Sequence, residues 1–64
     1  MKRVLIREVP NGMGRARVCG TLVLMLHRDV KEIASLDPLI VLMDEFSDAD
    51  VTTLATVGIV AEEA

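Results

Sequence analysis

The sequence has almost no aromatic residues and very few metal-binding ones. Phe46 is the only aromatic among 64 residues, so aliphatic side chains must fill the core. Stacking of nucleic-acid bases on aromatic side chains is not expected either. Cys19 cannot form a disulfide within the chain, and His27 is the only histidine, so no cysteine–histidine metal site is expected. We therefore predict no metal and no cofactor.

Long hydrophobic runs are also missing. The runs TLVLML (21–26) and PLIVLM (38–43) have six residues each, far fewer than the roughly 20 that cross a bilayer. Lys2 and Arg3 precede only short apolar runs broken by charge, which argues against a secretory signal. We expect no membrane association and a reducing, cytoplasmic setting.

Aliphatic residues are abundant instead, and hydrophobic residues make up 52% of the chain. The length allows one small domain, residues 1–64. A domain of this size buries only about 60% of its unfolded surface, so a chain this apolar leaves aliphatic side chains exposed as a monomer. Large exposed apolar patches usually mark interfaces. The composition therefore favours a homo-oligomer or a subunit of a larger assembly.

Charge is distributed unevenly along the chain. All seven basic residues lie within residues 1–31, whereas seven of the ten acidic residues follow residue 36. The simplest interpretation is that the two halves face each other, within one fold or across a dimer, and that the charges solvate the surface. The alternative is a basic patch for nucleic acid. Its residues would be Arg3, Arg7, Arg15 and Arg17.

The first half predicts an N-terminal β-hairpin. Residues 2–9 contain β-branched residues in rough alternation, and Asn11-Gly12 is typical of a tight turn. Residues 15–26 are then expected to form a long strand with a bulge or bend at Gly20. The continuous apolar run after Gly20 predicts a strand covered on both faces. Its side chains are the candidate interface residues: Leu22, Leu24, Met25 and Leu26.

The middle of the chain predicts a short helix followed by a central strand. Asp29 can cap a helix over residues 27–37, and Pro38 should end it. Residues 39–43 (LIVLM) are short and wholly apolar, and we expect a strand covered on both faces.

The last part predicts a capped helix and a closing strand. Ser47 is a preferred N-cap, and Asp50 three residues later can complete a capping box before a helix over 48–57. Gly58 supplies the stop. The closing strand should lie parallel to residues 39–43 and next to them, because a helix connects the two. Its expected features are a buried Ile59 and Val60, and Glu62 and Glu63 placed to meet basic residues of the first half.

Together these elements predict an α/β domain. We expect a small sheet of four to five strands with an N-terminal hairpin, a C-terminal strand–helix–strand unit and two short helices.

No motif in the chain predicts catalysis. The segment NGMG (11–14) lacks the spacing and the lysine of a phosphate-binding loop, and residues 44–50 lack the glycine and the distal glutamate of a calcium loop. His27 has no nucleophile or acid at a telling spacing, so a surface or capping role is expected. Cys19 is expected to be a packed residue rather than a nucleophile.

The second half resembles the swiveling, phosphohistidine-type domain of phosphoenolpyruvate-utilising enzymes. The residues that carry the resemblance are LIVLMDEF (39–46), the helix with Asp50 and Leu54, and GIVAEE (58–63). Upstream, GRARVCGTLVLM (14–25) is similar to a hairpin strand of that family. The resemblance implies a swiveling-type scaffold. The family's phosphorylated histidine follows the last of these segments and has no counterpart in the chain, so phosphotransfer is not implied.

The sequence thus predicts a non-catalytic binding or assembly module that acts through aliphatic strand surfaces, with a second copy or another protein chain as partner. The alternative is a truncated or inactive relative of the swiveling domain. Nucleic-acid binding through the basic first half is a weaker alternative.

Overall fold

The structure is a computed structural model that describes the whole chain, Met1–Ala64. Four strands and two helices follow one another in the order β-α-β-β-α-β. The elements are β1 (Lys2–Glu8), α1 (Arg15–Leu26), β2 (Glu32–Leu36), β3 (Leu39–Met43), α2 (Asp48–Ala55) and β4 (Val60–Glu63). The predicted α/β class, the numbers of strands and helices and the C-terminal strand–helix–strand order are confirmed, but one strand and one helix lie elsewhere in the chain than predicted.

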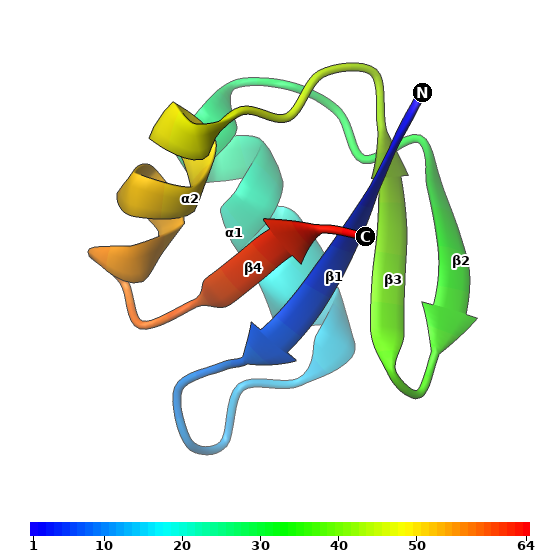
Figure 1. Cartoon of the computed structure of the whole chain (residues 1–64). Coiled ribbons are helices and arrows are strands. Elements are labelled where there is room, and N and C mark those ends of the chain that lie inside the picture. Colours follow the sequence, from blue (N-terminus) through cyan, green and yellow to red (C-terminus); the bar gives the residue numbers. More distant parts are fainter.

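The strands form one sheet in the order β2-β3-β1-β4, and every neighbouring pair is antiparallel. Each helix connects two strands that run in the same direction but are separated by a third. This is the split βαβ, or ferredoxin-like, arrangement. Both helices pack on the same side of the sheet, α1 behind the strands and α2 to their left in Figure 1, and the other side carries no element.

The predicted N-terminal hairpin is wrong, because residues 15–26 form helix α1 and not a strand. Val18, Leu22 and Leu26 recur every four residues and are the buried side chains of this helix. Apolar residues on its outer side, above all Leu24, hid this period and made the run look like a strand covered on both faces. Gly20 is not a bulge but an exposed position within the helix.

The predicted helix over residues 27–37 is also wrong. Helix α1 ends at His27, whose φ of 56° is the left-handed conformation common at helix C-termini. The chain then forms β2, which pairs with β3 through the turn at Asp37-Pro38. Pairing with β3 outweighed the helix-like spacing of Val30 and Ile33, because tertiary contacts override weak local signals.

Strand β3 and helix α2 form where the sequence predicts them. The capping box of Ser47 and Asp50 is present, and the backbone N–H of Ser47 donates to Asp50 Oδ2 at 2.8 Å. Gly58 has a φ of 81°, as a glycine stop requires. The chain itself covers one face of β3 and not both as predicted: Leu39, Val41 and Met43 are buried against the helices, whereas Ile40 and Leu42 lie on the other side.

Strand β4 pairs with β1 and not, as predicted, with β3. It does run parallel to β3, since both are antiparallel to β1, which lies between them. Ile59 is fully buried as predicted, but Val60 is 40% exposed and Ala61 takes the buried place. The two glutamates of β4 do meet basic residues of the first half, in the pairs Arg7–Glu62 and Lys2–Glu63.

The core lies between the sheet and the helices. Its 12 members come from every element except β2, together with two loop residues, Phe46 and Ile59. They are Val4, Ile6, Val18, Leu22, Leu26, Leu39, Val41, Met43, Phe46, Leu54, Ile59 and Ala61. Neither helix is long and apolar enough to cross a membrane.

Candidate functional site

The titratable side chains do not assemble into a reactive centre. No three of the histidine, cysteine, aspartate and glutamate side chains come together as metal ligands would. Cys19 is half-buried on α1, and burial raises the pKa of its thiol, so the thiol stays protonated and weakly nucleophilic at neutral pH. His27 is exposed at the end of α1, where its backbone N–H donates to Val23 at 2.9 Å. Its exposure is as predicted, but it caps the C-terminal end of α1 and not the start of a following helix.

Asp50 is the one buried charged residue, with 7% of its surface exposed. Its carboxylate accepts hydrogen bonds from Arg28 and from the backbone of Ser47. Burial by itself would raise the pKa of Asp50, but these hydrogen bonds and the positive charge of Arg28 together lower it. Arg28 also donates to the backbone oxygens of Leu26, at 3.3 Å, and Glu45, at 2.8 Å. The cluster ties the end of α1 to the start of α2 and is structural.

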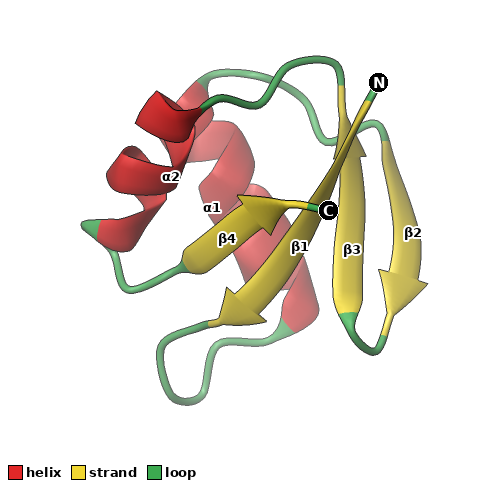
Figure 2. Cartoon of the chain, viewed as in Figure 1, coloured by secondary structure: helices red, strands yellow, loops and turns green.

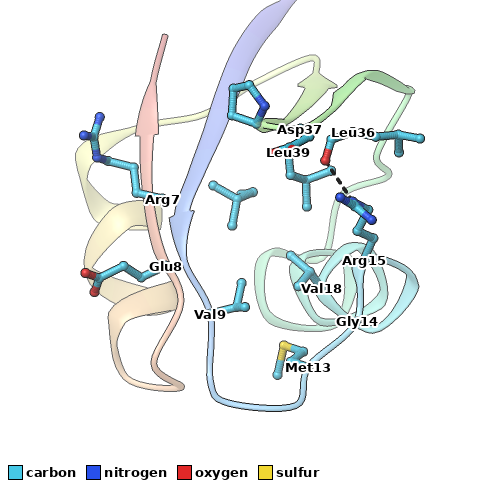
Figure 3. A pocket seen from close by; sticks show the side chains of 12 residues that line it. Arg7, Glu8, Val9, Met13, Gly14, Arg15, Val18, Leu36, Asp37 and Leu39 are labelled. Atoms are coloured by element: carbon cyan, nitrogen blue, oxygen red, sulfur yellow. Dashed lines mark hydrogen bonds between the residues drawn. The ribbon is translucent and has the colours of Figure 1, made fainter.

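An open cavity of about 400 Å³ lies where β1 ends and α1 begins, beside the turn between β2 and β3. Figure 3 shows Val9, Met13, Val18 and Leu39 around it, with the side chains of Arg7 and Glu8 directed away to one side. Arg15 closes one wall by donating from Nε to the Leu36 carbonyl at 2.8 Å (Figure 3). Half of the residues that line the cavity are hydrophobic, and both of its arginines already have partners within the chain, Arg15 at Leu36 and Arg7 at Glu62.

The side of the sheet away from the helices is the larger unexplained surface (Figure 2). The side chains of paired antiparallel residues point to the same face. Leu5 pairs with Ile40, and Leu42 pairs with Arg3. On the far side of β3, Glu32 pairs with Leu42, and Ser35 pairs with Ile40. We call this surface the open face. Its members are Arg3, Leu5, Arg7, Glu32, Ser35, Ile40, Leu42, Val60 and Glu62.

The centre of the open face is aliphatic, and its edge is polar or charged apart from Val60 on β4. Leu5, Ile40 and Leu42 are each only partly buried, on the two middle strands β1 and β3. Arg7 forms an ion pair with Glu62, whereas Arg3 and Glu32 form none. An apolar centre with a polar rim is the usual plan of a protein–protein interface.

The predicted interface residues are only partly at the surface. Leu22 and Leu26 belong to the core and cannot contact a partner. Met25 is half-buried and packs against that core, and Leu24 alone is well exposed, at 71%. The open-face residues Leu5, Ile40 and Leu42 were not predicted as an interface. The signal for two of them was present, since every residue of β3 is apolar although only alternate ones can face the helices.

The four arginines of the predicted basic patch do not lie together. Arg3 and Arg7 belong to the open face, whereas Arg15 and Arg17 lie on α1, on the other side of the sheet. Arg7 is neutralised by Glu62, and Arg15 is bound to a backbone oxygen. This placement leaves no continuous basic stripe of the kind that follows a nucleic-acid backbone.

Comparison of the chain with protein-family models, with curated proteins and with solved structures finds no match. The site therefore has to be interpreted from its own geometry.

Proposed function

We propose that this chain is a non-catalytic association module whose open face packs against another protein chain. The observation that carries the proposal is the partial exposure of Ile40 and Leu42 on a strand whose alternate residues, Val41 and Met43, are fully buried. A strand that is apolar on both faces is typical of a sheet covered on both sides. The helices supply one cover, and a partner would supply the other.

The physical gain from such packing comes from the aliphatic centre of the open face. Burying apolar surface contributes about 25 cal/mol for each Å² removed from water. Leu5, Ile40 and Leu42 form a contiguous group on neighbouring strands, so one flat partner surface could cover all three together. The charged residues around them would fix its orientation more than its affinity.

A direct test compares the wild-type chain with Ile40→Lys on the open face and Leu24→Lys on the outer side of α1. The wild type should either sediment above the 7.0 kDa of one chain or, as a monomer, enhance the fluorescence of an apolar dye. Ile40→Lys should abolish the self-association or the dye fluorescence that the wild type shows, and Leu24→Lys should preserve it. Circular dichroism checks that both variants fold. Equal signals from wild type and Ile40→Lys would overturn the proposal.

The relationship to swiveling domains is kept as a second, weaker proposal, that of a truncated or inactive relative. The strand–helix–strand unit β3-α2-β4 agrees with the resemblance. The upstream segment, residues 14–25, does not agree with it, because this segment forms most of helix α1, whereas the family has a hairpin strand there. A cytoplasmic location fits the single, half-buried cysteine and is part of the main proposal.

A further inference from the structure

We infer that the partner on the open face is a second copy of this chain, related to the first by a two-fold axis that runs along the strands between β1 and β3. The inference rests on the proposed function and adds the identity and orientation of the partner. A two-fold interface uses the same patch on both copies, so the patch must complement itself. The order of residues across the open face meets this condition.

Two rows of paired residues run across the open face. In the first row, Arg3 on β1 lies opposite Leu42 on β3, which lies opposite Glu32 on β2. In the second, Leu5 and Ile40 occupy the two central strands. This second row ends in Glu62 on β4 at one side and in Ser35 on β2 at the other. Each row therefore has a different polar group at each end, with one aliphatic residue between them in the first row and two in the second.

A two-fold axis along the strands places β3 of the second copy over β1 of the first. Each row of one copy then lies over the same row of the other copy. Leu5 then stacks on Ile40 of the second copy, and Ile40 on its Leu5. Arg3 lies over Leu42 of the second copy and next to its Glu32, and Glu62 lies over its Ser35. The two sheets would pack about 10 Å apart with their strands nearly aligned, the usual geometry of stacked sheets.

The charges select this axis over the alternative. A two-fold axis across the strands, through the row of Leu5 and Ile40, would place Arg3 over Arg7 of the second copy. Like charges opposed across an interface are unfavourable. The axis along the strands instead brings together Arg3 and Glu32, the two charged residues of the open face that have no ion pair within the chain. In the dimer, Arg3 of each copy would pair with Glu32 of the other.

The size of the open face sets the expected affinity. Four strands about 4.8 Å apart and on average about five residues long cover roughly 320 Å² in projection. A standard interface takes about 800 Å² from each partner. We therefore expect a dimer with a dissociation constant in the micromolar range, present at the concentrations of sedimentation or NMR experiments and dissociated on dilution.

The test is a charge exchange measured by sedimentation equilibrium over a range of concentrations. Arg3→Glu and Glu32→Arg should each raise the dissociation constant about tenfold, because each replaces two cross-dimer attractions with two repulsions. The double variant, with both exchanges, should return it to near the wild-type value. Arg17→Glu on α1 is the matched control and should leave it unchanged. Thermal unfolding of each variant shows that the fold is kept.

Three results would overturn the inference. A wild-type chain that stays at 7.0 kDa at every concentration would exclude the second copy, while Ile40-dependent dye binding would still support the proposed function. Self-association without rescue in the double variant would exclude this two-fold arrangement. Loss of the dimer in Ile33→Lys, on the edge strand β2, with no effect of Ile40→Lys, would place the contact at the sheet edge and would contradict the proposed function as well.

Discussion

Leu5 and Ile40 lie directly opposite each other in β1 and β3, on the face of the sheet that neither helix covers (Figure 2). The next pair of the same register, Val4 and Val41, points to the helices and is fully buried. The two central strands therefore present aliphatic pairs on both faces, and the chain itself covers only one of them. The proposals above follow from this asymmetry.

The capping box at the start of α2 should contribute measurably to stability. Ser47→Ala removes the side chain that caps the helix, and we expect the free energy of unfolding to fall by about 1 kcal/mol. Thr52→Ala is the control, because Thr52 is exposed within the same helix. Urea unfolding followed by circular dichroism measures both. A smaller loss for Ser47→Ala than for Thr52→Ala would show that the cap is dispensable.

Substitutions of Gly58 and Gly20 by alanine should change stability in opposite directions. Gly58→Ala should lower the free energy of unfolding by about 1–2 kcal/mol, because its φ of 81° disfavours a side chain and the new Cβ would lie 3.1 Å from Pro10 Cγ. Gly20→Ala should raise it by up to about 1 kcal/mol, since Gly20 is helical and nothing lies within 4 Å of the added Cβ. Thermal melts of the pair give the comparison. Equal effects would contradict the assigned backbone at one of the two sites.

Because of the ion pair between Arg28 and Asp50, we expect the free energy of unfolding to depend on pH in the acid range. The pKa of Asp50 is lower in the folded chain than in the unfolded one, so its contribution is complete above the unfolded pKa and is lost as pH falls through the lowered folded pKa. Asp50→Asn should therefore be less stable than wild type at pH 6, and the difference should shrink below about pH 4. Glu63→Gln, at an exposed pair, is the control. A difference that stays constant down to pH 2 would refute the linkage.

Removing Arg28 should cost more than removing an exposed arginine. Arg28→Met leaves the Asp50 carboxylate buried without its charged partner and takes a hydrogen bond from the Glu45 carbonyl. We expect a loss of about 2 kcal/mol in the free energy of unfolding, below the value for a fully buried pair because Arg28 is partly exposed. Arg17→Met, at an exposed site on α1, should change stability by less than about 0.5 kcal/mol. Similar losses in both variants would mean that the cluster has no structural role.

The closing strand should be indispensable. Deleting residues 58–64 removes Ile59 and Ala61 from the core. It also removes β4, so β1, which is a central strand in the full chain, becomes an exposed edge strand. We expect the shortened chain to unfold or aggregate. An amide NMR spectrum as dispersed as that of the full chain would contradict this.

The parts of the fold that the sequence predicted are those with strong local signals. Ser47, Asp50 and Gly58 mark both ends of α2, and the wholly apolar run of β3 marks a strand wherever it pairs. The sequence did not predict helix α1 because the helix carries apolar residues on its outer side as well as its buried side. Val23 and Leu24, which are exposed, mask the period of 3.6 residues.

The pairing of the strands could not be predicted from local signals. Both C-terminal strands were recognised, but the insertion of β1 between β3 and β4 is a long-range choice that no neighbouring residue encodes. The candidate surface depends on this choice. Ile40 and Leu42 could be recognised as apolar on the second face of β3, but Leu5, Arg3 and Glu32 join them only through the register.

Intermolecular contacts between methyl groups test the central claim most directly. A sample that mixes isotope-labelled and unlabelled chains at millimolar concentration reports, in a filtered NOE experiment, only contacts between different copies. The two-fold arrangement predicts cross-peaks between the methyl groups of Leu5 in one copy and Ile40 in the other, with none to Leu24 on α1. A spectrum without intermolecular cross-peaks, or with cross-peaks to Leu24 but not to Leu5 and Ile40, would contradict the claim that a second copy covers the open face.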